Sequence, residues 1–356
     1  MKDILCRFLS KSFSELAPNA TISNAMVANA IKTAASTQDF LENTCKKEGN
    51  KPNADIIFKR IKQCDPNVLK TAFKLIMAFM IKRVKYKFNR RGWDLAIDSH
   101  YEAFYGEYKD EWIHGYKADK GCEGSYKFIT IAVVIGDERF TLMALPESKQ
   151  DNLEDLVEEL VLEARKHLRL RVVLFDRWFY NNFVIRRLKE LKIPYLIMGR
   201  LFPGNKKVLE DMDPFTHKYI LREVYWRGVH MKHKLLFIKD FIDFTDFKIH
   251  DWLFATNLSN IKAYQYVFIY KKRWGIETTY KMFGNFRIPT CSRNHIVRYF
   301  LFIAIIVLYN WWKFYNLLSE NKITFKTFVY YLFLSSLNLD HIQIARDKID
   351  EFFDLI

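Results

Sequence analysis

The chain has 356 residues, of which half are hydrophobic and 16% are aromatic. This length and composition provide for a large buried core, so an intrinsically disordered protein is excluded. The formal net charge of +15 favours a polyanionic partner, nucleic acid first and an anionic membrane surface second, over charge that serves solubility alone.

The cysteines and the apolar runs indicate the compartment. The five cysteines are scattered and form no C-x-x-C pair, which argues against a disulfide framework or a zinc ribbon and favours a reducing interior. The N-terminus has no signal-peptide pattern. The apolar run 299–312 is short for a membrane span and contains Asn310, so we expect a buried core helix. These features predict a cytoplasmic protein that does not enter a membrane.

Residues 1–91 are predicted to be helical, with helices near 23–35 and 53–63 and a third that begins at Asp65. Asp65 is a helix cap, and Pro66 follows it at the first helical position. The last of these helices ends in a basic cluster: Lys82, Arg83, Lys85, Lys87, Arg90 and Arg91. The cluster is a candidate surface for the DNA backbone, and equally a solvated helix end whose cations suit the helix dipole.

The next part of the chain predicts strands and helices in the order β-β-β-α-β-α-β. The predicted strands are 93–97, 126–135, 139–145, 171–175 and 193–198, and the predicted helices are 151–167 and 181–191. The first strand is expected to end on Asp98 and the fourth on Asp176. Residues 200–250 break this rhythm and predict an insertion with strands at 218–226 and 231–238. One more strand, 251–257, precedes a helix that begins at Asn260, and helices at 324–334 and 339–353 follow.

The helix that contains residues 270–281 carries an acid among bases. Tyr270, Arg273, Glu277 and Lys281 are spaced i, i+3, i+7 and i+11, so all four are expected on one helix face. A carboxylate among cations stays ionised and suits a metal ion or a phosphate site. The alternative is a solvated basic face with ion pairs around Glu277. Three other side chains are expected to anchor this helix in a core: Trp274, Ile276 and Tyr280.

Two strand-end acids and Glu277 together indicate a site. Active sites gather at strand ends in α/β sheets, although either Asp98 or Asp176 alone is more often a turn residue. Three converging carboxylates repel one another unless a cation lies between them, and oxygen ligands select Mg²⁺ or Mn²⁺ over zinc. Two such ions roughly 4 Å apart activate a water or a 3′-hydroxyl for attack on a phosphodiester. A basic chain with this site is expected to catalyse phosphoryl transfer on DNA.

Three segments carry a resemblance to a known family: AIDSH at 96–100, LFDRWFY at 174–180 and YKKRWGIE at 270–277. Over roughly residues 90–315 the chain resembles the DDE transposases of prokaryotic insertion sequences, which have an RNase H-like core. The last segment resembles their Tyr-x2-Arg-x3-Glu-x6-Lys signature. The signature lysine would fall at Gly284, and Lys281, one helical turn beyond Glu277, is the nearest candidate for its role.

The resemblance implies an α/β fold: an RNase H-like mixed sheet flanked by helices, with a β-rich insertion before the helix of the catalytic glutamate. The expected divisions are a helical DNA-binding region at 1–91, the core at 92–200 and 251–315, the insertion at 201–250 and a helical region at 316–356. It also implies that Asp98, Asp176 and Glu277 are catalytic and bind two Mg²⁺ ions, with Mn²⁺ as the alternative. The implied reaction is cleavage at transposon ends and transfer of the 3′-hydroxyl into target DNA. The implied partners are double-stranded DNA and a second copy in a synaptic homodimer.

The DNA-binding residues expected on these grounds are Tyr270, Arg273, Lys281, Lys272, Arg177, Trp226, Lys85, Lys87, Arg90 and Arg91. For Arg177, a surface ion pair is favoured over contact with DNA. Trp226 could stack on an unpaired or flipped base, or pack within the insertion. His100 is expected to be structural.

Two alternative functions stay open on the sequence: an RNase H-like nuclease or resolvase without strand transfer, and a transposase-derived DNA-binding protein without catalysis. The presence of all three acids argues against the second alternative. No Gly-rich phosphate loop is present, so an ATP-driven mechanism is not supported.

Overall fold

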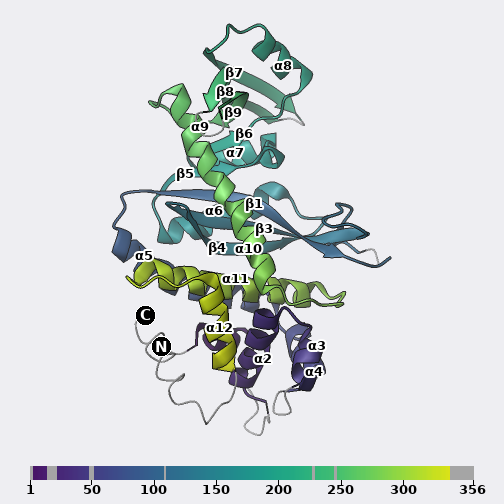
Figure 1. Ribbon diagram of the computed structural model, residues 1–356. Helices are drawn as coiled ribbons and strands as arrows, with labels where there is room; N and C mark the ends of the chain where they lie inside the picture. The colour runs from purple at the N-terminus through teal and green to yellow at the C-terminus, as the bar shows by residue number, and fades with distance from the viewer. Residues whose placement is uncertain are drawn as a thin grey trace.

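The computed structural model of the chain describes residues 3–13, 22–47, 52–107, 110–226, 229–243 and 247–336. Figure 1 shows a helical base, a central sheet above it and a narrower β-rich extension at the top. The sheet has nine strands in the order β2-β3-β1-β5-β6-β9-β8-β7, and β4 pairs with β3. The fold is therefore the mixed α/β architecture that the sequence predicts.

The central strands follow the predicted order. They are β1 (Trp93–Phe104), β2 (Ile113–His114), β3 (Gly124–Ile135), β4 (Glu138–Glu147), β5 (Leu170–Phe175) and β6 (Tyr195–Met198). β1 pairs antiparallel with β3 and parallel with β5, and β5 pairs parallel with β6. The short β2 was not among the predicted strands.

The insertion extends the same sheet. Its elements are α8 (Pro203–Glu210), β7 (His217–Trp226) and β8 (Val229–Asp243). The strand β9 (Lys248–Thr256) follows them. β9 pairs with β6 on one side and with β8 on the other. Helix α8 is an element that the sequence analysis did not predict. The predicted domain boundaries stay predictions.

Alternate residues of the central strands face two different helical layers, because the side-chain period of a strand is two. Ala96 and Leu174 pack in one cluster with residues of α9 (Ala263–Lys271) and α10 (Gly275–Phe283). Ile97 and Phe175 pack in the other cluster, which includes residues of α6 (Leu153–His167) and α7 (Asn182–Glu190). The acids of β1 at even positions therefore face α9 and α10.

The base is a helical layer formed by both ends of the described chain (Figure 1). Its helices are α1 (Ile4–Ser12), α2 (Asn24–Thr37), α3 (Leu41–Lys47), α4 (Ala54–Lys62), α5 (Pro66–Phe88), α11 (His295–Leu318) and α12 (Phe325–Ser336). Side chains of Ser23, Asn53 and Asp65 cap α2, α4 and α5. The predicted N-terminal helices and the helix near 324–334 are confirmed. The helix predicted at 339–353 lies outside the described residues.

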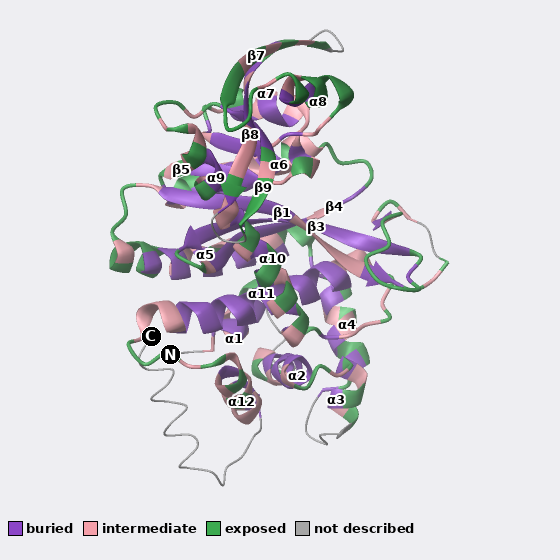
Figure 2. Ribbon diagram, turned by 45° about the horizontal axis from the view of Figure 1, so that its top comes forward, coloured by how far each residue is buried: buried purple, intermediate pink, exposed green. Residues whose placement is uncertain are grey.

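Helix α11 is the one described helix long and apolar enough to cross a membrane, and 89% of its apolar window is buried inside the protein. Figure 2 shows it as mainly buried. Asn310 is fully buried, accepts a hydrogen bond from the Thr141 amide (3.2 Å) and donates one to the Thr141 carbonyl (2.7 Å). The prediction that 299–312 forms a core helix is confirmed.

The helix through residues 270–281 is not continuous. A 3₁₀ turn, η2 (Lys272–Trp274), separates α9 from α10. Arg139 of β4 donates a hydrogen bond to the Lys272 carbonyl, and a Cβ on Gly275 would lie 2.6 Å from the Arg139 guanidinium. The glycine therefore leaves room for an arginine that holds the carbonyl freed by the turn. Trp274 is 46% exposed, which corrects its predicted role as a core anchor, whereas Ile276 is fully buried.

Candidate active site

Asp98 lies in the middle of β1 rather than at its end, which corrects the sequence prediction. The parallel pairing of β1 with β5 stops at Ile97 and Phe175, but the antiparallel pairing with β3 continues to Phe104. The long apolar β3 supports this continuation, and a reading of β1 alone misses it. Asp98 and Asp176 are thus the first residues beyond the last parallel pair, and the two acids lie side by side.

The two aspartates are held by backbone amides. Asp98 is 7% exposed, and its Oδ1 accepts a hydrogen bond from the Ser99 amide at 2.8 Å. Asp176 starts the 3₁₀ turn η1 (Arg177–Phe179), and its Oδ1 accepts from the Trp178 amide at 2.9 Å. Both carboxylates are therefore oriented by the local backbone.

Arg273 links two of the three acids. Its Nη1 lies 2.7 Å from Asp98 Oδ2, and its Nη2 lies 2.8 Å from Glu277 Oε1. The arginine is 6% exposed and lies beside the ring of Tyr270, which is 2% exposed. Both side chains lie inside the protein, so contact with a DNA phosphate would require them to move.

Glu277 stands at the rim of the site, with its side chain 57% exposed. Its helix is fixed to the sheet by the hydroxyl groups of Tyr280 and Thr130, which are 2.7 Å apart. Thr130 is the cross-strand neighbour of Asp98. This contact holds Glu277 near the two aspartates.

The site has more negative charge than Arg273 offsets. Burial raises the pKa of Asp98 to about 7; Arg273 opposes this rise, and Asp176 and Glu277 add to it. Burial also raises the pKa of Asp176. A cation among these groups would favour their ionised forms.

The donor chemistry fits a divalent cation, but the side chains as placed do not form a metal centre. Within the described ranges, no three His, Cys, Asp or Glu side chains are grouped so as to hold a metal ion. The Arg273 guanidinium takes the central position between Asp98 and Glu277. Binding of a metal ion by all three acids would require Arg273 to release the two carboxylates.

A family model described as "Transposase DDE domain" matches residues 90–311. The chain belongs to this transposase family. No curated protein sequence matches the chain significantly. Among solved structures, the chain is similar to one titled as the cryo-EM structure of the piggyBac transposase synaptic complex with hairpin DNA. The TM-score is 0.57 at 14% identity, over 99% of this chain and 83% of that one. This second likeness concerns the fold alone.

In this DDE transposase, some of the predicted DNA-binding residues are exposed and others are buried. Lys281 is exposed, and a Cβ at Gly284 would meet nothing within 4 Å. Arg177 is exposed beside Asp176. The side chain of Trp226 lies outside the described residues.

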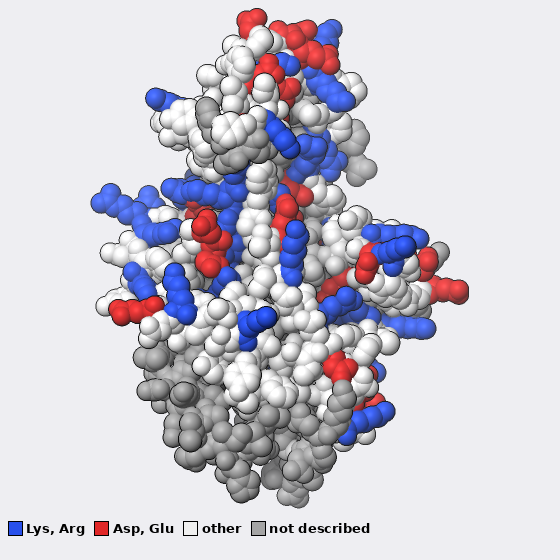
Figure 3. Space-filling model, viewed as in Figure 1, with Lys and Arg blue, Asp and Glu red and all other residues white. Residues whose placement is uncertain are grey.

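The basic cluster at the end of α5 is exposed. Lys85 donates to the His167 carbonyl, Lys87 donates to the Leu318 carbonyl, and the Arg90 guanidinium lies 5.4 Å from the Trp93 ring. Arg91 is exposed beside them. Lys and Arg side chains gather at the left of Figure 3 at the level of the sheet, where β5 and the end of α5 lie. This side of the transposase is therefore basic.

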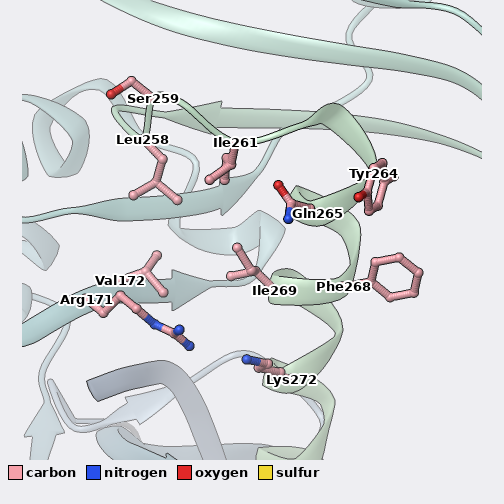
Figure 4. Close-up of a pocket in the computed structure, with 10 residues that line it drawn as sticks. All are labelled: Arg171, Val172, Leu258, Ser259, Ile261, Tyr264, Gln265, Phe268, Ile269 and Lys272. Atoms are coloured by element: carbon pink, nitrogen blue, oxygen red, sulfur yellow. The ribbon is translucent and has the colours of Figure 1, made fainter. Parts of the chain in front are cut away.

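Lys272 points away from the three acids. It binds Asp94 at 3.1 Å and borders a mostly apolar pocket of about 490 Å³ (Figure 4). Arg171, on the neighbouring strand, binds the same carboxylate. The structure therefore places Lys272 at a second buried acid on β1.

Sequence reasoning missed three residues that support the site: Lys127, Thr130 and Tyr280. Thr130 has no distinguishing signal, since a threonine is ordinary in a strand. Tyr280 was expected only as an anchor. Lys127 had a signal, because it is the one charged residue in the apolar run 126–135. His100 stacks on Phe302 at 5.0 Å, and burial lowers its pKa to about 4. The stacking supports a structural role for His100.

Proposed function

We propose that this transposase cleaves phosphodiester bonds at the ends of a prokaryotic insertion sequence and joins the freed 3′-hydroxyl to target DNA. One observation carries the proposal. Asp98 and Asp176 lie side by side where two parallel strands part, and Arg273 ties Glu277 to Asp98. The family match over residues 90–311 supports the assignment of this cluster to DNA chemistry.

Asp98, Asp176 and Glu277 would hold the proposed cofactor, two Mg²⁺ ions with Mn²⁺ as the alternative. Carboxylate oxygens are the ligands that these cations prefer. When bound, such ions supply activation of the attacking oxygen and stabilisation of the leaving oxygen. The protein holds Asp98 on a paired strand, Asp176 on a capped turn and Glu277 on a helix fixed through Tyr280.

Arg273 has a second proposed role once it leaves the carboxylates. A guanidinium binds phosphate in two-point geometry as well as it binds carboxylate. Release from Asp98 and Glu277 would therefore make it available to a terminal phosphate of the DNA. Lys281, Lys272, Arg177 and the basic cluster at the end of α5 are the further proposed contacts to double-stranded DNA.

The proposed assembly is a homodimer that holds two DNA ends together, acting in the cytoplasm of a prokaryotic cell. The test uses a supercoiled plasmid that carries the two flanks of the gene, purified full-length protein and Mg²⁺. Excised and joined products are expected, with sequencing of the junctions to locate the cleaved bonds.

Glu277→Gln is the control for the chemistry. This variant should bind the DNA ends as the wild type does and give no product, because it keeps the side-chain shape but loses the charge. Nicking without joined products would support a nuclease instead. DNA binding without products from the wild type would support a non-catalytic DNA-binding protein.

A further inference from the structure

Lys127 is a buried lysine on the face of β3 opposite Thr130, the cross-strand neighbour of Asp98. Its charge opposes the rise that burial causes in the pKa of Asp176. Its side chain is 3% exposed, and its ammonium lies 2.7 Å from Glu147 Oε2. The same ammonium lies 3.1 Å from the centre of the Trp178 ring. Lys127 and Glu147 are cross-strand neighbours on β3 and β4, so the sheet register holds the pair together.

A charge buried this deeply needs partners, because removing an ammonium from water is costly. Glu147 supplies the opposite charge, and the face of an indole ring attracts a cation. The ring is fixed in turn by an edge-to-face contact with Phe179, which is fully buried, at 5.0 Å. Lys127 therefore contacts both Glu147 and Trp178, and we call these three side chains the Lys127 clamp.

The Lys127 clamp reaches the site through Trp178. The amide of Trp178 donates the hydrogen bond that orients Asp176 Oδ1. The ring of the same residue rests on the Lys127 ammonium. A shift of the ring would thus move the amide that holds the carboxylate. Asp98 has a different support, because its backbone is paired with β3.

We propose that Lys127 is a positioning residue for Asp176: with Glu147, it fixes Trp178 and hence the turn that aims this carboxylate at the candidate metal site. The inference rests on the proposed function, because it assumes that Asp176 binds the cation. Removal of the clamp should weaken binding of the metal ion without removing any of its ligands. Groups that orient metal ligands typically change metal affinity by roughly 10–100-fold.

The test measures Mn²⁺ binding to the full chain without DNA, from the loss of the free-ion signal in electron paramagnetic resonance. Lys127→Met keeps the length of the side chain and removes its charge. We expect its Mn²⁺ affinity to be about 10-fold or more below that of the wild type. Trp178→Leu should show the same loss, and Trp178→Phe, which keeps an aromatic ring, should recover most of the affinity.

The matched control is Lys74→Met. Lys74 also pairs with glutamates, Glu159 and Glu163, but on α5 and α6. Its loss should leave the Mn²⁺ affinity unchanged. Far-UV circular dichroism checks that each variant is folded. If Lys127→Met fails to fold, the difference between Trp178→Leu and Trp178→Phe decides the question.

A folded Lys127→Met variant with wild-type Mn²⁺ affinity would overturn the inference and leave the proposed function intact. Equal affinities for Trp178→Leu and Trp178→Phe would also overturn it. A wild-type chain that binds no Mn²⁺, either alone or with a DNA duplex taken from the flanks of the gene, would instead overturn the proposed function, and the inference with it.

Discussion

Two buried aspartates lie four residues apart on the same face of β1, in opposite electrostatic states. Asp94 is 4% exposed and binds both Arg171 and Lys272, which hold its pKa below the ordinary value although burial opposes them. Asp98 is 7% exposed, and among the described residues its one ion-pair partner is Arg273, which it shares with Glu277. Its pKa is raised to about 7 by burial and by neighbouring acids.

The difference separates a structural acid from a candidate catalytic one. At Asp94, two cations neutralise one carboxylate, as expected for an ion pair that stabilises the fold. At Asp98, one guanidinium serves two carboxylates and a third acid lies beside them. A shortage of positive charge at a buried site is typical of a place where a cation binds.

The largest expected effect is on catalysis. Asp98→Asn should reduce cleavage of end-bearing plasmid below detection, because it removes a proposed ligand of the metal ion. Asp94→Asn should keep measurable cleavage, since Asp94 contacts none of the three acids in the described structure. Products from Asp98→Asn would contradict the assignment.

The second effect is on the free energy of unfolding. Asp94→Asn should lower it by about 2 kcal/mol, the scale of hydrogen bonds to charged partners. Asp98→Asn should not lower it, because the ionised Asp98 is unfavourable without a metal ion. Urea denaturation in EDTA measures both variants, and an equal loss in the two would remove the distinction.

The third effect is the pH dependence of stability in EDTA. The pKa of Asp98 is raised on folding. Its contribution to the free energy of unfolding is therefore present below about pH 4 and is lost as the pH rises toward 7. The pKa of Asp94 is lowered, so its contribution is present above about pH 4 and is lost as the pH falls further. As the pH rises from 4 to 7, the melting temperature of Asp98→Asn should therefore increase relative to that of the wild type. Below pH 4, the difference by which the melting temperature of Asp94→Asn falls short of the wild type should become smaller.

The smallest effect comes from adding a cation at the end of the helix that carries Glu277. Gly284→Lys restores the signature lysine at a position with open space and helical backbone, so the fold should be unchanged. DNA affinity should rise modestly, and the slope of log affinity against log salt should steepen by about 1. Lys281→Gln should shift the slope the other way. Filter binding across a salt series measures both, and a slope unchanged in both variants would exclude phosphate contacts there.

Much of the fold follows from local patterns in the sequence. The apolar runs of β3 and β5 and the caps Asn53 and Asp65 are local signals, and each led to a correct element. The end of β1 was misplaced because its continuation depends on pairing with β3, a contact made across the sheet. The 3₁₀ turn η2 was missed because its contact with Arg139 comes from β4, 133 residues earlier in the chain.

The candidate site was predictable as a set of residues and not as a set of contacts. Asp98, Asp176 and Glu277 were singled out by strand ends and by the signature segment. The helical spacing indicated ion pairs around Glu277, and Arg273 forms one of them. The sequence could not indicate that Arg273 would also bind Asp98, because that contact joins residues 175 positions apart in the chain. The distinction between Asp94 and Asp98 was also hidden, since both are acids in one apolar strand.

The continuation of β1 past Asp98 gives the three acids unequal mechanical stiffness. Asp98 lies in an antiparallel pairing with β3 that continues to Phe104, so its backbone is the most firmly held of the three. Asp176 stands on a single short turn, and Glu277 stands on a helix segment that follows a 3₁₀ break. Under the proposed function, we therefore expect Asp176 and Glu277 to adjust their positions when DNA binds, while Asp98 stays in place.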